Sequence, residues 1–90
     1  MRIYSGIVEN GFEEITQDVI EDWAYDDGWE LFDLYVQGDG SVDFEFEANA
    51  PGNFSRDMQE ASLGMLSILI ERAHKRMTGG EAFVQWTNLG

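Results

Sequence analysis

Residues 42–48 alternate strictly between apolar and acidic side chains, which is the pattern of a β-strand with one buried and one exposed face. The apolar members are Val42, Phe44, Phe46 and Ala48, and the acidic members are Asp43, Glu45 and Glu47. The turn-forming residues 38–41 precede this run, and residues 29–36 before the turn are rich in strand-forming types. A β-hairpin is therefore predicted over residues 29–48, with its apolar face packed against helices.

A helix and a strand are predicted before this hairpin. Residues 2–8 are rich in Ile, Val and Tyr and indicate a strand. Asn10, followed by Glu13 three residues later, predicts the capping box of a helix that ends near Asp27. Gly28 can then take the left-handed conformation that terminates it. The apolar residues at helical spacing are Phe12, Ile15, Val19, Ile20 and Trp23.

A second helix and a fourth strand are predicted after the hairpin. The helix should run from about Ser55 to Met77 and end at Gly79 and Gly80. Its expected apolar stripe consists of Met58, Ala61, Met65, Leu66, Leu69 and Ala73. Residues 81–87 indicate the last strand. The order β-α-β-β-α-β predicts an α+β, ferredoxin-like fold, a four-stranded antiparallel sheet with two helices on one face, as a single domain over residues 1–90.

The distribution of charge limits the choice of partner. Eighteen acidic residues oppose five basic ones, for a net charge of −13. Between Ile3 and Ser55 there are fourteen carboxylates and no Lys or Arg. Nucleic acid and anionic membrane surfaces both attract Lys- and Arg-rich proteins, so neither is an expected partner.

The same residues bear on localisation. The chain has no cysteine, so it has neither disulfides nor thiolate metal sites. A charge appears too early for a signal peptide, and the apolar run Leu63–Ile70 is far shorter than the roughly 20 residues of a membrane span. We expect a cytoplasmic protein.

No catalytic, cofactor or metal site is expected. The single histidine, His74, follows Ser67 by seven residues, which places them about 10 Å apart along a helix, too far for proton transfer. We expect His74 to lie on the surface at the helix end. No carboxylate is distinguished from its neighbours as a raised-pKa acid, no glycine-rich phosphate loop is present, and Asp39–Asp43 lacks the spacing of a calcium loop.

The acidic residues themselves are the candidate partner-binding site. Glu14, Asp18, Asp22 and Asp26 form like-charged pairs four residues apart in the first helix, and each pair costs a few tenths of a kcal/mol. Neighbours at this spacing rise about 6 Å along the axis. Alternate residues in a strand lie about 6.8 Å apart. Both spacings approach every second phosphate of a DNA strand. The predicted site comprises Glu13, Glu14, Asp18, Glu21, Asp22, Asp26, Asp27, Asp33, Tyr35, Asp43, Glu45 and Glu47.

Other interpretations of the acidic surface remain open at this point. It can be a solubilising surface, or the surface of a protein from a salt-loving organism. The uncovered face of the sheet is expected to carry Leu31 and Tyr35 around Asp33, where the rings suit a protein interface or a homodimer. A homodimeric regulatory or small-ligand-binding module is the alternative function.

In its size, its charge and its lack of cysteine and catalytic groups, the chain resembles small acidic phage-encoded inhibitors, such as anti-CRISPR proteins and inhibitors of DNA-processing enzymes. The resemblance is one of composition and covers the whole chain. It implies a DNA-mimic mechanism in which the carboxylates occupy the basic nucleic-acid-binding surface of a partner protein in the host cytoplasm and block entry without chemistry.

Overall fold

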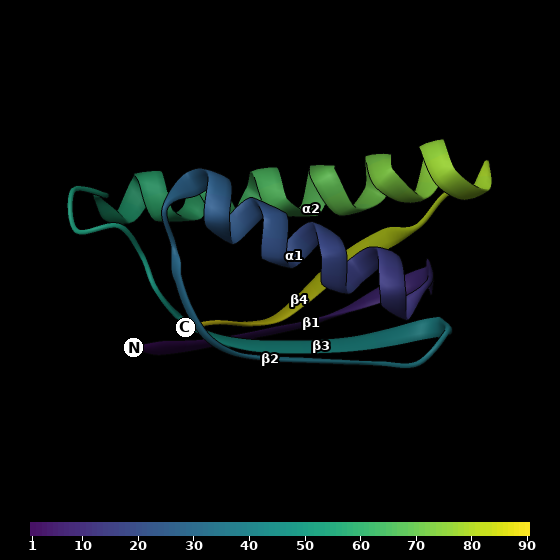
Figure 1. Cartoon of the computed structure of the whole chain (residues 1–90), viewed down its shortest axis with the longest axis horizontal. Coiled ribbons are helices and arrows are strands. Elements are labelled where there is room, and N and C mark those ends of the chain that lie inside the picture. The colour runs from purple at the N-terminus through teal and green to yellow at the C-terminus, as the bar shows by residue number, and fades with distance from the viewer.

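The computed structural model describes all 90 residues and has the predicted element order. Figure 1 shows two layers, with both helices on one face of a four-stranded sheet. The elements are β1 (Arg2–Gly11), α1 (Glu13–Asp27), β2 (Glu30–Gln37), β3 (Gly40–Asn49), α2 (Arg56–Thr78) and β4 (Phe83–Leu89). The strands lie in the order β2-β3-β1-β4 and all neighbours are antiparallel, so the ferredoxin-like prediction is confirmed.

The alternation in β3 divides the sheet as predicted. The four apolar side chains of β3 are buried beneath the helices, whereas Asp43 and Glu45 are exposed on the opposite face. On the central strand β1, Gly6 lies opposite Phe44, and a Cβ at this glycine would stand 2.6 Å from the Phe44 ring. The ring occupies this space, which requires glycine at position 6.

Aromatic side chains join the helices to the sheet. The rings of Trp23 on α1 and Trp29, which directly precedes β2, lie 4.9 Å apart, and Tyr4 contacts Trp29 edge-on. Both indole N–H groups donate to Ser62 of α2: Trp23 to its carbonyl at 3.0 Å and Trp29 to its hydroxyl at 2.9 Å. The Ser62 hydroxyl donates in turn to Asp27, so this buried serine is fully hydrogen-bonded. It fixes the distance between the two helices.

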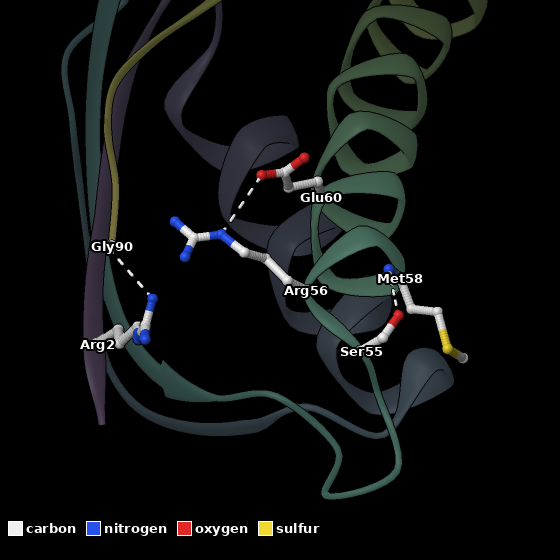
Figure 2. A network of polar contacts seen from close by, with 6 residues as sticks. All are labelled: Arg2, Ser55, Arg56, Met58, Glu60 and Gly90. Atoms are coloured by element: carbon white, nitrogen blue, oxygen red, sulfur yellow. Dashed lines mark hydrogen bonds and ion pairs between the residues drawn. The ribbon is translucent and has the colours of Figure 1, made fainter.

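Helix α2 begins and ends as the sequence predicts. Ser55 is its N-cap and accepts a hydrogen bond from the Met58 amide (Figure 2). Gly79 terminates it in the left-handed conformation, and Lys75 and Arg76 lie in its last turn. Cations there complement the negative end of the helix dipole.

The start of α1 differs from the capping box predicted at Asn10 and Glu13. Strand β1 continues to Gly11, Asn10 has a left-handed φ of 58°, and Phe12 is the N-cap without a side-chain cap bond. Groups distant in sequence bind the free amides instead. The Glu13 N–H donates to Asp39 in the β2–β3 turn, and the Phe12 N–H donates to His74 Nε2. The capping-box prediction is wrong because tertiary contacts supply the cap.

The buried stripe of α2 is rotated relative to the predicted one. Met58, Ala61 and Met65 were expected to be buried but are exposed. The buried residues of the helix are Ser62, Leu63, Leu66, Ile70, Ala73 and His74. Leu66 and Ala73 were predicted correctly. Ser62 and His74 are polar, so apolar periodicity alone does not indicate the true face.

A β-bulge in β2 moves Leu31 away from its predicted place. Leu31 pairs with Ala48 and packs against the core, and the register shifts by one residue before Asp33, which pairs with Glu47. Because a bulge inserts one residue, it exchanges the faces of residues on its two sides. Leu31 therefore lies on the helix side of the sheet, whereas Asp33 and Tyr35 lie on the open face.

Neither helix of the structure combines the length and the apolar character that a membrane crossing requires.

Candidate acidic interaction surfaces

The outward face of α1 forms the first acidic surface. We define the α1 surface as Glu14, Asp18, Glu21, Asp22 and Tyr25, all of which are exposed. The opposite side of the helix, with Ile20 and Trp23, is buried in the core. Helical periodicity thus projects four carboxylates away from the sheet on one face, as the sequence predicts.

Tyr25 is the residue of the α1 surface that the sequence analysis missed. Its side chain is 87% exposed, more than any other large apolar or aromatic residue in the chain. It lies one turn after Glu21 on the same face of the helix. Exposed tyrosines commonly anchor protein interfaces. The sequence does contain a signal for its exposure. Tyr25 is spaced with the acidic residues of the helix and does not fit the apolar stripe.

The open face of the sheet forms the second acidic surface. We define the sheet surface as Asp33, Tyr35, Asp43, Glu45 and Glu47. The register pairs Asp33 with Glu47 and Tyr35 with Glu45 across β2 and β3. Carboxylates directly opposite one another in a sheet repel, so the Asp33–Glu47 pair is unfavourable for the fold. A shallow hollow of about 390 Å³ lies beside Tyr35 and extends over Ile7 and Thr87.

The structure places these two surfaces on opposite sides of the molecule. Both helices cover one face of the sheet (Figure 1). The residues of the α1 surface lie on the exposed side of α1, whereas the buried residues of this helix face the core. The sheet surface lies on the other face. A flat partner can therefore contact one of them at a time. The twelve residues predicted as one site do not form one contiguous patch.

Almost none of the negative charge is neutralised within the chain. The structure has one ion pair, Arg56 with Glu60, at 3.9 Å, and both side chains are largely exposed. No carboxylate of the α1 surface or the sheet surface has a basic partner or an internal hydrogen bond. The acidic residues on both surfaces are therefore free to meet an external cation.

Two of the predicted site residues have roles within the fold, and a third lies in the groove between the helices. Glu13 accepts a hydrogen bond from the Gly38 amide, and Asp27 accepts one from Ser62. Asp26 lines a groove of about 350 Å³ between the helices, opposite Arg72 and Arg76. Glu13 and Asp27 join α1 to the hairpin and to α2, so we assign them to folding rather than to the acidic surfaces.

A cleft of about 720 Å³ opens at the beginning of α1. It is lined by Glu13, Glu14, Asp18 and Asp39 around Phe12, Ile15 and Met77. No three acidic or histidine side chains in the chain lie close enough together to hold a metal ion. The cleft thus extends the negative charge of the α1 surface toward the β2–β3 turn.

The prediction that His74 lies on the surface is wrong. His74 is fully buried, and its ring stacks against Phe12. Nε2 accepts from the Phe12 amide at 2.9 Å, and Nδ1 donates to the Ile70 carbonyl at 2.7 Å. With both nitrogens hydrogen-bonded inside the protein, His74 is a structural link between β1, α1 and α2. Ser67 is also engaged, since its hydroxyl accepts from Trp86.

One ionisable group has a clearly displaced pKa, and it lies outside both acidic surfaces. Burial raises the pKa of the Tyr4 hydroxyl above its ordinary value of 10.0, and the nearby positive charge of Arg2 partly opposes this change. Desolvation disfavours the phenolate because it is the charged form.

Comparison with known proteins supports the fold and nothing finer. No family model matches the sequence, and no curated protein is similar to it. Among solved structures, the fold is similar to part of a formyltetrahydrofolate deformylase from Pseudomonas putida KT2440, with a TM-score of 0.59 over 97% of this chain. The two sequences are 11% identical, and the match spans 29% of the deformylase chain. At this identity the likeness shows the ferredoxin-like fold alone.

Proposed function

We propose that this chain is a non-enzymatic acidic binding protein that inhibits a nucleic-acid-binding partner by occupying its Lys- and Arg-rich surface, as a DNA mimic or an anti-CRISPR protein does. The observation that carries the proposal is the absence of neutralisation: of eighteen carboxylate side chains, only Glu60 is ion-paired within the chain. We place its action in the cytoplasm, where such partners are found.

The α1 surface is the part of the molecule that we assign to the partner. Its like-charged pairs weaken an isolated helix. The helix also has no basic residue in its last turn to offset the dipole. Four carboxylates around the highly exposed Tyr25 provide both long-range attraction and an aromatic anchor. Binding of this kind is fast and weakens as salt is added, because screening shortens the reach of the field.

Two matched variants test this assignment, since each removes three negative charges and leaves the core unchanged. The α1 variant combines Asp18→Asn, Glu21→Gln and Asp22→Asn, and the sheet variant combines Asp43→Asn, Glu45→Gln and Glu47→Gln. Each is used, beside the parent protein, to capture proteins from a lysate of the cells in which the gene is expressed. We expect the parent to recover nucleic-acid-binding proteins that added duplex DNA releases, and the α1 variant to lose them.

The sheet variant serves as the control and should retain this capture. If the sheet variant alone loses the partner, the proposed mode of action stands but the surface is misassigned. Capture that neither variant nor duplex DNA diminishes would refute inhibition by charge mimicry.

One observation favours a second function, that of a homodimeric regulatory or small-ligand-binding module. The structural likeness is to 29% of a larger protein, so this fold occurs there as one part of a longer chain. The hollow beside Tyr35 on the sheet surface is the place where a small ligand would bind under this alternative. Binding to a partner would then be unaffected by the α1 variant.

A further inference from the structure

The outer face of α2 carries apolar side chains that the rest of the chain leaves partly exposed. Met65 and Ile68 are nearly half exposed, and Ala61 and Gly64 are also exposed. A Cβ placed on Gly64 would meet no atom within 4 Å. The helix already buries its opposite side with Leu66 and Ile70. These outer residues therefore form a second apolar face that folding of the single chain does not require.

Charged residues lie at both ends of this second face. We define the α2 stripe as Asp57, Ala61, Gly64, Ile68, Arg72 and Lys75, which follow one another at intervals of three or four residues. Such intervals place side chains on one side of a helix. The stripe is acidic at its beginning, apolar in its middle and basic at its end. Arg56 and Glu60 are off the stripe, and in Figure 2 they point toward the side where Arg2 and Gly90 lie.

The stripe is complementary to itself when a second copy runs in the opposite direction. Consider a two-fold axis that meets the exposed side of α2 at the level of residue 66. It places Asp57 of one helix opposite Lys75 of the other, because these residues lie nine positions before and nine positions after that level. The same axis places Ile68 opposite Gly64, two residues away on either side. Arg72 lies within one turn of Lys75 and can also reach Asp57 of the second copy. A single symmetric contact thus satisfies both the charges and the apolar residues.

The distribution of charge over the molecule also favours contact between two copies through α2. Helix α2 contains four basic and three acidic residues, whereas fifteen carboxylates and one arginine lie outside it. Two copies that approach through the α1 surface or the sheet surface bring like charges together, which is strongly unfavourable. The residues of α2 that face α1 include Ser62, Leu69 and Ala73, and among the stripe residues only Arg72 also lines the groove between the two helices. Contact through the stripe therefore leaves the α1 surface free.

From this complementarity we propose that the chain forms a homodimer through antiparallel contact of two α2 stripes. The proposal goes beyond the proposed function and does not depend on it. A single helix pair lies at the low end of stable interface sizes, so the dimer is expected to dissociate in about the micromolar range.

Charge-exchange variants give the decisive test, by sedimentation velocity at about 100 µM, well above the expected dissociation constant. One variant, Arg72→Glu with Lys75→Glu, makes both ends of the stripe acidic, and the other, Asp57→Lys, makes both ends basic. We expect the parent to be a dimer, each variant alone to be a monomer, and an equimolar mixture of the two to form a one-to-one heterodimer. Recovery in the mixture cannot arise from a folding defect.

Two single substitutions, one inside the stripe and one outside it, locate the contact independently. Ile68→Lys places a charge against Gly64 and should weaken association by about tenfold or more, whereas Tyr35→Lys on the sheet surface should leave it unchanged. Circular dichroism melting confirms that both variants fold. The proposal is overturned if the parent is a monomer at about 100 µM, if the mixed charge variants do not associate, or if Tyr35→Lys disrupts a dimer that Ile68→Lys leaves intact.

Discussion

Both ends of helix α2 are capped by neighbouring residues, whereas the start of α1 depends on residues far away in the sequence. Ser55 caps α2, and Lys75 and Arg76 complement its dipole. Helix α1 has no side-chain cap of its own, no basic residue in its last turn and a row of like-charged carboxylates. Its first amides are bound by Asp39 and His74. The contrast shows that local interactions stabilise α2. Tertiary contacts stabilise α1 and offset the repulsion between the carboxylates on its surface.

The largest effect on stability is expected when the side chain that packs α1 against the core is removed. Trp23→Ala deletes a buried indole and its hydrogen bond to Ser62, and should lower the free energy of unfolding by about 3–5 kcal/mol. Met58→Ala, on the exposed side of α2, should change it by less than about 0.5 kcal/mol. Urea denaturation followed by circular dichroism measures both. Equal losses for the two variants would contradict a tertiary origin for α1 stability.

A smaller effect is expected when the distant cap of α1 is removed. His74→Ala leaves the Phe12 amide without its acceptor and should cost about 1–3 kcal/mol for that group, with a further loss from the cavity. Ser55→Ala, the equivalent change at the local cap of α2, should cost about 1 kcal/mol.

Hydrogen exchange tells the two caps apart. His74→Ala should speed exchange at the start of α1, and Ser55→Ala should speed it at the start of α2. If His74→Ala leaves the first turn of α1 as well protected as in the parent, the assigned role of the histidine is incorrect.

The outer faces of the two helices should respond in opposite directions to charge reversal. Asp18→Lys converts two repulsive pairs on α1, with Glu14 and Asp22, into attractive ones, and should raise stability by about 0.5–1 kcal/mol at low salt. Lys75→Glu reverses a favourable charge at the end of α2 and should lower stability by about 0.3–1 kcal/mol. Thermal melts at low and high salt measure both changes. Added salt should shrink each of them, and a change that persists in high salt would point to another cause.

The last prediction concerns the beginning of α2, whose residues Arg56 and Leu63 line the same hollow as Tyr4. Because burial raises the pKa of Tyr4 in the folded state, this state retains the phenolic proton at a pH where the unfolded chain loses it. The stability from this group is complete below about pH 10, the ordinary pKa of tyrosine, and falls as the pH rises above that value.

Tyr4→Phe tests this behaviour. It should have little effect near neutral pH but should flatten the alkaline decline in melting temperature. Tyr25→Phe is the matched control, since Tyr25 is highly exposed and has no comparable burial. An alkaline decline that is identical in the parent and in Tyr4→Phe would assign it to other groups.

Many features of the fold were predictable because they depend on neighbours in the chain. The alternation of residues 42–48 was enough to predict β3 and its two faces. Gly28 and Gly79 end their helices as expected, and Ser55 begins α2. The exposure of Asp18 and Asp22 on α1 also followed from helical periodicity. Each of these features is decided within about one turn of helix or one strand.

Apart from Tyr25, whose exposure follows from its spacing in α1, the features that the sequence analysis missed require a partner from elsewhere in the chain. His74 was expected on the surface at a helix end, but the Phe12 amide, from the start of α1, donates a hydrogen bond to it in the interior. The buried face of α2 includes Ser62, because the two indoles that bind it come from α1 and from Trp29, just before β2. Leu31 lies on the helix side of the sheet because of a bulge in β2. The pattern of residues in β2 does not predict this bulge.

The sequence by itself determined the order of elements, the faces of the alternating strand and the large excess of carboxylates, since these follow from periodicity and composition. Only the tertiary structure decided that the carboxylates divide between two opposite surfaces, and that α2 keeps an exposed stripe of apolar and complementary charged residues. The physical reason is that a pattern along one element specifies which residues share a face. Which face is buried depends on the side chains that other elements bring against it, and these contacts form only when the chain has folded.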